Sequence, residues 1–290
     1  MYDRGWKRIG TLTLFLAPSL IGVSIFLIGP IIASFGLAFA HWDLLTQPRF
    51  AALENFVTLF NDPEFWGALG HTLLFIVGYV PLVMVLGLMV AVALNSSIPG
   101  RGLFRVVYFL PVVTSWVAVA LVWKWLLNPS YGLVNNALAS IGVTGPAWLF
   151  DPAWAMPAVI LTSLWKDVGF VMTILLAGLQ GIPNEYLEAA SIDGATGSQR
   201  LWHITLPLLA PASFFALTIS LINSFQVFDQ VYVMTAGGPA GATTVLIERI
   251  VKNAFSYSKM GYAAAMSWAL FLLVFLSSSL ISKARSRWSA

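Results

Sequence analysis

Residues 71–94 of this chain read HTLLFIVGYVPLVMVLGLMVAVAL, a stretch without Asp, Glu, Lys or Arg. A helix spans the hydrocarbon core of a bilayer with about 20 consecutive apolar residues. At 1.5 Å of rise per residue, these residues would form a helix about 36 Å long. The stretch therefore predicts a transmembrane helix.

The composition of the whole chain also indicates that its surroundings are lipid and not water. Of 290 residues, 59% are hydrophobic and 9% are charged, whereas soluble domains average about 25% charged residues. The absence of cysteine excludes disulfides, thiolate metal sites and a cysteine nucleophile. The net charge of +3 is not gathered into a basic face, so a nucleic-acid partner is not expected. The expected partner of this surface is the lipid bilayer.

Five further runs are apolar and long enough to cross a bilayer. The six predicted spans are 9–40, 71–94, 106–127, 153–180, 206–228 and 261–282. No repeat and no low-complexity linker divides the chain. The sequence therefore predicts an all-α membrane protein with six transmembrane helices in one domain over 1–290.

The distribution of basic residues predicts the orientation, because cytoplasmic loops carry the excess of Lys and Arg. With both termini in the cytoplasm, the inside holds Arg4, Lys7, Arg8, Arg101, Arg105, Arg200, Lys283, Arg285 and Arg287. The outside then holds only Arg49, Arg249, Lys252 and Lys259. The first apolar run is about twice as long as a signal-peptide core. We therefore expect the triplet Ala38-Phe39-Ala40 to belong to a span and not to a cleavage site.

The most informative stretch, residues 183–204, joins the fourth and fifth predicted spans on the cytoplasmic side. Pro183 marks a helix start. Glu185 and Glu188 lie in the first turns, where the helix dipole favours negative charge. Gly194 can adopt a positive φ and end this helix.

A second short helix is expected after the glycine, with Ser198 as its cap. The segment is then a helix, a glycine turn and a helix, too short and too polar to be a span. Ala189 and Ala190 are small and would let another surface approach closely. We interpret the segment as a docking element; the alternative is a solvated amphipathic loop.

A spaced motif within this segment carries a resemblance to a known family. It consists of Glu188-Ala189-Ala190, then Gly194, then Ile204, then Leu206-Pro207. This motif resembles the EAA motif of binding-protein-dependent ABC importer permeases, and its spacing fits without gaps.

The resemblance covers most of the chain. Two further motifs resemble sugar-type permeases: a loop with Thr235-Ala236-Gly237-Gly238-Pro239 and Thr243-Thr244, and a first span with Leu16-Ala17-Pro18 and Gly29-Pro30. The chain resembles a subfamily that handles oligosaccharides and glycerol 3-phosphate. Within this subfamily, it resembles the first of the two permeases.

The resemblance implies the partners and the coupling residues. Members of this group work as two related permeases with a cytoplasmic ATPase dimer, and an extracytoplasmic binding protein delivers the solute. The coupling helices sit in a groove of the ATPase, and Glu188 would meet a basic residue there. By position, the ATPase-coupling residues are Glu188, Ala189, Ala190, Asp193 and Gly194.

The chain has no phosphate loop of the form G-x-x-x-x-G-K-[ST]. We therefore expect a non-catalytic transport subunit of the bacterial inner membrane without a cofactor of its own. ATP and Mg²⁺ would bind the partner ATPase, which drives alternating access.

Polar side chains inside the predicted spans are the candidates for a solute pathway. A charge in a membrane costs about 2.5–3.5 kcal/mol on insertion scales, so it usually faces a cavity or a partner. We expect spans four and five to line the pathway, and three aromatic residues, Trp165, Phe225 and Phe228, could stack on sugar faces. The predicted pathway residues are Lys166, Asp167, Asn223, Ser224, Gln226 and Asp229.

The alternative for these residues is that Asn223 and Ser224 only bridge helices, as polar residues in membrane bundles often do. Lys124 lies beside Trp123 and Trp125, and snorkelling to the interface accounts for it. No metal site is expected, because His41, His71 and His203 show no ligand spacing.

Three other functions fit parts of the sequence. An ion-coupled transporter or channel would use the buried polar groups but would have no need of residues 183–204. A membrane enzyme would need a nucleophile and a base, and no such set is recognisable. A passive scaffold would tolerate replacement of Glu188 and Gly194.

Overall fold

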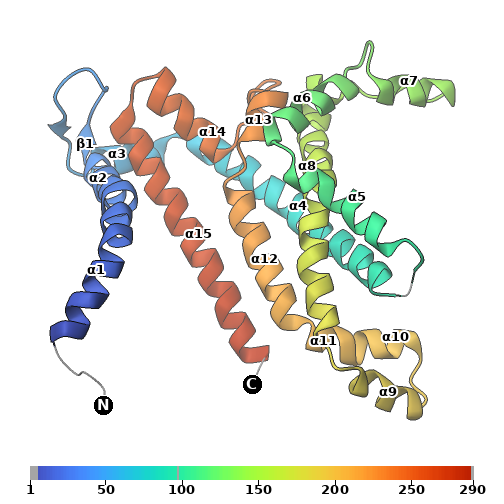
Figure 1. Cartoon of the computed structure of the whole chain (residues 1–290). Helices are drawn as coiled ribbons and strands as arrows, with labels where there is room; N and C mark the ends of the chain where they lie inside the picture. The colour runs from blue at the N-terminus through green and yellow to red at the C-terminus, as the bar shows by residue number, and fades with distance from the viewer. Residues whose placement is uncertain (1–5, 97, 289–290) are drawn as a thin grey trace. The chain divides into compact units, whose positions relative to one another are not determined.

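The computed structural model describes residues 6–96 and 98–288, and most of these residues are helical (Figure 1). The one strand pair in that part of the chain joins β1 (Ala40–His41) to β2 (Arg49–Phe50) in antiparallel register. Some residues of the charge count lie outside the described part: Arg4, and the side chains of Lys7, Arg8, Arg285 and Arg287.

Contacts divide the described chain into two compact units, and each is described by itself. One unit comprises the described residues up to Asp62 together with Ile250–Ala269. The other comprises Pro63–Arg249 and the described residues from Leu270 onward. The single domain over 1–290 stays a prediction.

The first unit begins with helical segments that follow one another without a gap. Its elements are α1 (Trp6–Val23), η1 (Ser24–Ile28), α2 (Gly29–Leu37), β1, β2, α3 (Glu54–Asn61), η4 (Lys252–Ser256) and the start of α15 (Met260–Trp288). Asn55 holds the chain just after α2, because its side-chain amide donates to the carbonyls of Ala38 and Ala40, each at 3.0 Å. The Tyr262 hydroxyl donates to Asp62 at 2.6 Å and ties α15 to the same region.

The second unit holds the remaining elements. They are α4 (Pro63–Asn95), α5 (Arg101–Val113), α6 (Trp116–Leu126), α7 (Leu133–Ser140), η2 (Trp148–Phe150), α8 (Pro152–Gln180), α9 (Asn184–Ile192), α10 (Gly197–Arg200), η3 (Leu201–Thr205), α11 (Leu206–Leu208), α12 (Ala210–Phe225), α13 (Asp229–Met234) and most of α14 (Leu246–Val251).

In the described part of the chain, four helices are long and apolar enough to cross a membrane by themselves. They are Thr11–Leu37, Pro63–Asn95, Pro152–Gln180 and Met260–Lys283, of 27, 33, 29 and 24 residues. They correspond to four of the predicted spans, 9–40, 71–94, 153–180 and 261–282. The other two predicted spans each correspond to a pair of helices with a bend between them.

The helix predicted over 106–127 is interrupted in the structure. α5 and α6 meet at an angle of 99°, because Thr114 and Ser115 are extended. Pro111 in the last turn of α5 has no N–H to donate to the preceding turn, which weakens the helix there.

The predicted helix over 206–228 is wrong at both ends. The chain bends by 67° where the helical run ending at Leu208 meets α12. At its far end α12 stops at Phe225, and α13 begins at Asp229. Gln226, Val227 and Phe228 therefore lie in an irregular segment in which side chains do not follow helical spacing.

α8 is the central helix of the second unit and packs against α4, α5 and α12 (Figure 1). Val159, Val171 and Met172 on α8 are at most 1% exposed. The crossing with α5 requires glycine at position 169, because a Cβ there would meet the carbonyl oxygen of Tyr108. Small residues allow this close approach of membrane helices. The crossing lies next to Lys166 and Asp167 in the sequence of α8.

Candidate functional site

The turn after α9 has the geometry of a Schellman motif, in which two amides close the helix end. Gly194 has a φ of 77°, and its amide donates to the Ser191 carbonyl at 3.2 Å. The Ala195 amide donates to the Ala190 carbonyl at 2.9 Å. The predicted glycine turn is therefore present, and both of its hydrogen bonds satisfy carbonyls at the end of α9.

α10 starts with a capping box, in which the cap and the third helical residue bond to each other. Thr196 Oγ1 accepts from the Gln199 amide at 3.4 Å, and the Thr196 amide donates to Gln199 Oε1 at 2.7 Å. The prediction that Ser198 caps this helix is wrong, because Ser198 already lies in the first turn of α10. The helix, turn and helix are thus held by bonds between residues close in sequence.

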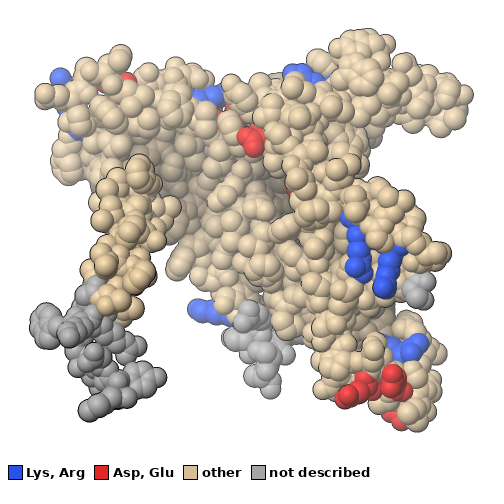
Figure 2. All heavy atoms as spheres, in the orientation of Figure 1, with Lys and Arg blue, Asp and Glu red and all other residues tan. Residues whose placement is uncertain are grey.

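Residues 183–204, the predicted coupling segment, present acidic side chains to solvent. Glu185, Glu188 and Asp193 are exposed, and Figure 2 shows acidic side chains gathered over the end of the molecule that carries α9 and α10. Ala189 is exposed, whereas Ala190 is 7% exposed and packs inside this chain. Neighbouring residues of a helix point about 100° apart. Only Ala189 of the pair therefore lies on the outer surface.

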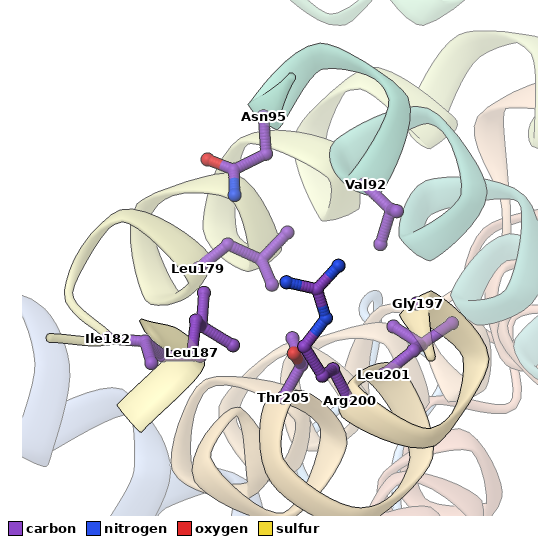
Figure 3. A pocket seen from close by; sticks show the side chains of 9 residues that line it. All are labelled: Val92, Asn95, Leu179, Ile182, Leu187, Gly197, Arg200, Leu201 and Thr205. Atoms are coloured by element: carbon purple, nitrogen blue, oxygen red, sulfur yellow. The ribbon is translucent and has the colours of Figure 1, made fainter. Parts of the chain in front are cut away.

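A pocket of about 350 Å³ lies behind the coupling segment, where the ends of α4 and α8 meet α9 and α10. Figure 3 shows the guanidinium of Arg200 extending toward the middle of the side chains that line this pocket. Its Nη1 donates to Ser191 Oγ at 2.7 Å and so ties α10 to α9. The lining residues are Val92, Asn95, Leu179, Ile182, Leu187, Gly197, Arg200, Leu201 and Thr205.

A second, polar cavity of about 250 Å³ lies among α4, α6, α8 and the irregular segment between α12 and α13. Its walls are Phe75, Tyr79, Trp116, Asp167, Asn223, Ser224, Gln226, Val227, Phe228, Asp229 and Gln230. Five of the six predicted pathway residues are therefore brought together. Asn223, Gln226 and Asp229 are exposed in the isolated chain, so the cavity is open on one side.

Hydrogen bonds hold the inner wall of this cavity in place. The Tyr79 hydroxyl donates to Asp167 Oδ2 at 2.9 Å, and the Tyr79 ring stacks on Phe75 with centroids 5.2 Å apart. Ser224 is 1% exposed, and its hydroxyl donates to the Ser220 carbonyl at 2.6 Å. Ser224 therefore bonds within its own helix and does not bridge two helices through this hydroxyl, while Asp167 borders the open space.

Lys166 is the predicted pathway residue that does not line the cavity. Its ammonium donates to the Val112 carbonyl at 3.1 Å and lies 4.8 Å from the centroid of the Trp116 ring. Val112 is in the last turn of α5, where carbonyls have no helical donor and a cation is favoured by the dipole. Lys166 thus supports the break between α5 and α6.

The three predicted aromatic residues lie in different places. Phe228 borders the polar cavity, and Phe225 is 4% exposed in the packed interior. Trp165 and Trp123 make an edge contact with centroids 5.7 Å apart and line a separate apolar cavity of about 340 Å³.

Five cavity residues lie outside the sequence prediction: Phe75, Tyr79, Trp116, Val227 and Gln230. Tyr79 carries a polar hydroxyl within an otherwise apolar run, and this pattern could have indicated a cavity residue from the sequence. Lys124, predicted to snorkel, donates to the Val233 carbonyl at 3.0 Å. The described residues contain no group of three His, Asp or Glu able to hold a metal ion.

The glycine-rich loop of residues 235–244 is tied to α4. The Thr235 and Thr243 hydroxyls lie 2.7 Å apart, and His71 Nδ1 lies 3.1 Å from the Thr244 carbonyl. The loop with Thr235-Ala236-Gly237-Gly238-Pro239 is therefore held by hydrogen bonds within itself and to α4. It follows α13 in the second unit.

The family model described as "Binding-protein-dependent transport system inner membrane component" matches residues 83–287, which is more than half of the chain and includes the coupling segment. The chain belongs to this family. This permease is the membrane subunit of an ABC importer, a transport component that crosses the inner membrane several times.

Relatives extend the similarity along nearly the whole permease. The "Probable ABC transporter permease protein YesP" of Bacillus subtilis (strain 168) is 37% identical over 279 residues, which cover 94% of this chain and 90% of the relative. The "Trehalose/maltose transport system permease protein MalF" of Thermococcus litoralis is 37% identical over 263 residues, covering 90% and 88%. The "Lactose transport system permease protein LacF" of Rhizobium radiobacter is 37% identical over 280 residues, covering 94% and 91%.

A solved structure has the same fold. One chain of a bacterial alginate ABC transporter, crystallised with its pentasaccharide-bound periplasmic protein, is similar to this permease with a TM-score of 0.86. The two chains are 27% identical, and the match covers 97% of this permease and 96% of that chain.

Proposed function

We propose that this permease forms one half of the translocation pathway of a heterodimeric ABC importer for neutral sugars. The observation that carries the proposal is the polar cavity, which gathers two carboxylates, amide side chains and aromatic rings inside an apolar protein. Carboxylates and amides suit hydroxyl groups, and aromatic faces suit the apolar faces of sugars. The open side of the cavity is where we place the second permease.

The six spans and their orientation are part of this proposal. We take each of the two bent helix pairs as one broken span. Together with the four long helices of the described chain, this gives six spans. The excess of Lys and Arg places both termini and the coupling segment in the cytoplasm. Broken helices are tolerated at membrane depth where they line a cavity or are buried in protein, and both breaks lie in the unit that holds the polar cavity.

We assign coupling to the exposed acidic surface of α9 and its turn. Glu188 and Asp193 would face basic groups of the ATPase, and Gly194 would set the angle between α9 and α10. ATP and Mg²⁺ would bind the partner ATPase dimer, and an extracytoplasmic binding protein would deliver the solute. The proposed cytoplasmic end of α8 is followed by α9 after three residues. A displacement of the coupling segment by the ATPase would therefore be transmitted to α8, the helix that carries Asp167.

The charge of the cavity favours a neutral solute over an anionic one. Asp167 and Asp229 border the open space, whereas the ammonium of Lys166 is directed to Val112 and Trp116. Among the described residues that line the cavity, two are carboxylates and none is a Lys or Arg, so an anion would meet negative charge there. The trehalose/maltose and lactose permeases among the relatives are consistent with neutral sugars, and a glycerol 3-phosphate carrier fits less well.

The test is uptake into liposomes that contain this permease, the second permease and the ATPase, with the binding protein on the opposite side. The panel sets neutral di- and oligosaccharides against glycerol 3-phosphate and uronate oligosaccharides, because a relative of the same fold imports an acidic polysaccharide. We expect ATP-dependent uptake of a neutral sugar. Preferred uptake of the anions would overturn the solute class, and solute flux without ATP would overturn the coupling.

A further inference from the structure

A groove between α5 and α8 combines an apolar wall with one cation. Its volume is about 470 Å³. α5 contributes residues from Arg105 to Val113 and α8 contributes residues from Met172 to Gln180. At 1.5 Å per residue, each wall is about 12 Å long. Leu176 forms the floor at 5% exposure, while Val113 is 72% exposed at the side.

Two of the three guanidinium nitrogens of Arg105, a half-buried residue, lack a hydrogen-bond partner in the described chain. Its Nε and Nη2 are buried from solvent and make no hydrogen bond to any described residue. Burying such a group without an acceptor is unfavourable. The groove offers no carboxylate, and the hydroxyl of Thr173 is already donated to the Gly169 carbonyl at 2.8 Å. An external acceptor would satisfy Arg105.

The groove opens at one end of the membrane-spanning helices. Arg105 lies one turn after the start of α5, and Gln180 is the last residue of α8. Arg101, one turn earlier than Arg105, is exposed, and Figure 2 shows basic side chains at the surface over the start of α5. This is the depth at which lipid headgroups meet the hydrocarbon core.

We propose that this groove binds one anionic phospholipid, with the phosphate on Arg105 and an acyl chain along α5 and α8. Guanidinium matches phosphate by paired hydrogen bonds, and basic pockets between membrane helices bind anionic headgroups. Charge complementarity selects a lipid over a helix of the second permease, which would have to bring a carboxylate to this depth. Because α8 leads into α9, an occupied groove braces the helix from which the coupling segment projects.

The test uses the whole complex of both permeases and the ATPase, purified in detergent, stripped of lipid and examined by native mass spectrometry. Phosphatidylglycerol and phosphatidylcholine are added in separate arms. We expect a one-lipid adduct that favours phosphatidylglycerol and that Arg105→Gln weakens by about tenfold or more, the loss expected for charge-assisted bonds. Arg105→Lys should recover part of the binding, and Arg101→Gln serves as the matched control with little effect.

A second variant keeps the charge of Arg105 and fills the groove between α5 and α8. Ala177 is an exposed lining residue, so Ala177→Phe should also reduce the adduct, which covers the case that Arg105→Gln fails to assemble. Inorganic phosphate at the same concentration should not displace the lipid. Equal binding of both lipids would overturn the proposal. So would an unchanged adduct in both variants, or a photo-cross-linker at Val113 that captures the second permease.

Discussion

Replacement of Gly194 by alanine probes the coupling segment through a single backbone angle. Gly194 has a φ of 77°, a region that costs an L-residue about 1–2 kcal/mol. A Cβ at this position would meet nothing within 4 Å, so no steric clash adds to this cost. The turn should then be about 5- to 30-fold less populated relative to other conformations.

The assay measures two quantities: the affinity of the purified permease pair for the ATPase, and ATP-dependent uptake into liposomes. We expect both to fall by that factor in Gly194→Ala. Gly194→Asn should lie between alanine and glycine, because asparagine tolerates the left-handed region better. Gly197→Ala is the matched control, since Gly197 also has open space around it but has no positive φ.

Equal affinity and uptake in Gly194→Ala and the wild-type complex would refute this reasoning. That result would mean that the ATPase does not need the angle between α9 and α10. An equal loss in Gly197→Ala would also refute it, because the effect would then not come from backbone strain.

Three further predictions follow from the site. Thr196→Ala removes the capping box and should destabilise the α10 region by about 0.5–2 kcal/mol, measured as faster amide hydrogen exchange there, whereas Ser198→Ala should have almost no effect. Lys166→Met should lower the stability of the complex by about 1–3 kcal/mol, because the Val112 carbonyl at the end of α5 would lose its hydrogen-bond donor. It should leave the preference for neutral over anionic solutes unchanged, and a reversal of that preference would place Lys166 in the pathway. Asp167→Asn should raise the uptake of anionic sugars relative to neutral ones; an unchanged ratio would argue against a role of Asp167 near the solute.

Features formed by neighbours in sequence were predictable. The apolar runs predict helices because each run supplies its own backbone bonds in lipid, and four of the six runs are long, unbroken helices. The turn at Gly194 was predicted because glycine favours a positive φ at a helix end. The cap prediction falls on Ser198 because serine is a more favoured cap than threonine. The spacing of Thr196 and Gln199 matches a capping box and is the sequence signal that identifies the observed cap.

The order of residues along the chain is enough to identify a membrane protein and to predict a helix, a turn and a helix in residues 183–204. These features depend on bonds and dihedral angles within a few residues. The polar cavity depends on packing between distant parts of the chain, because Tyr79 and Asp167 are 88 positions apart and meet where α4 packs on α8. Tertiary structure also directed Lys166 away from the cavity. The carbonyl it bonds, that of Val112, lacks a helical donor because α5 ends at Val113, and sequence patterns do not reveal where such an acceptor lies in space.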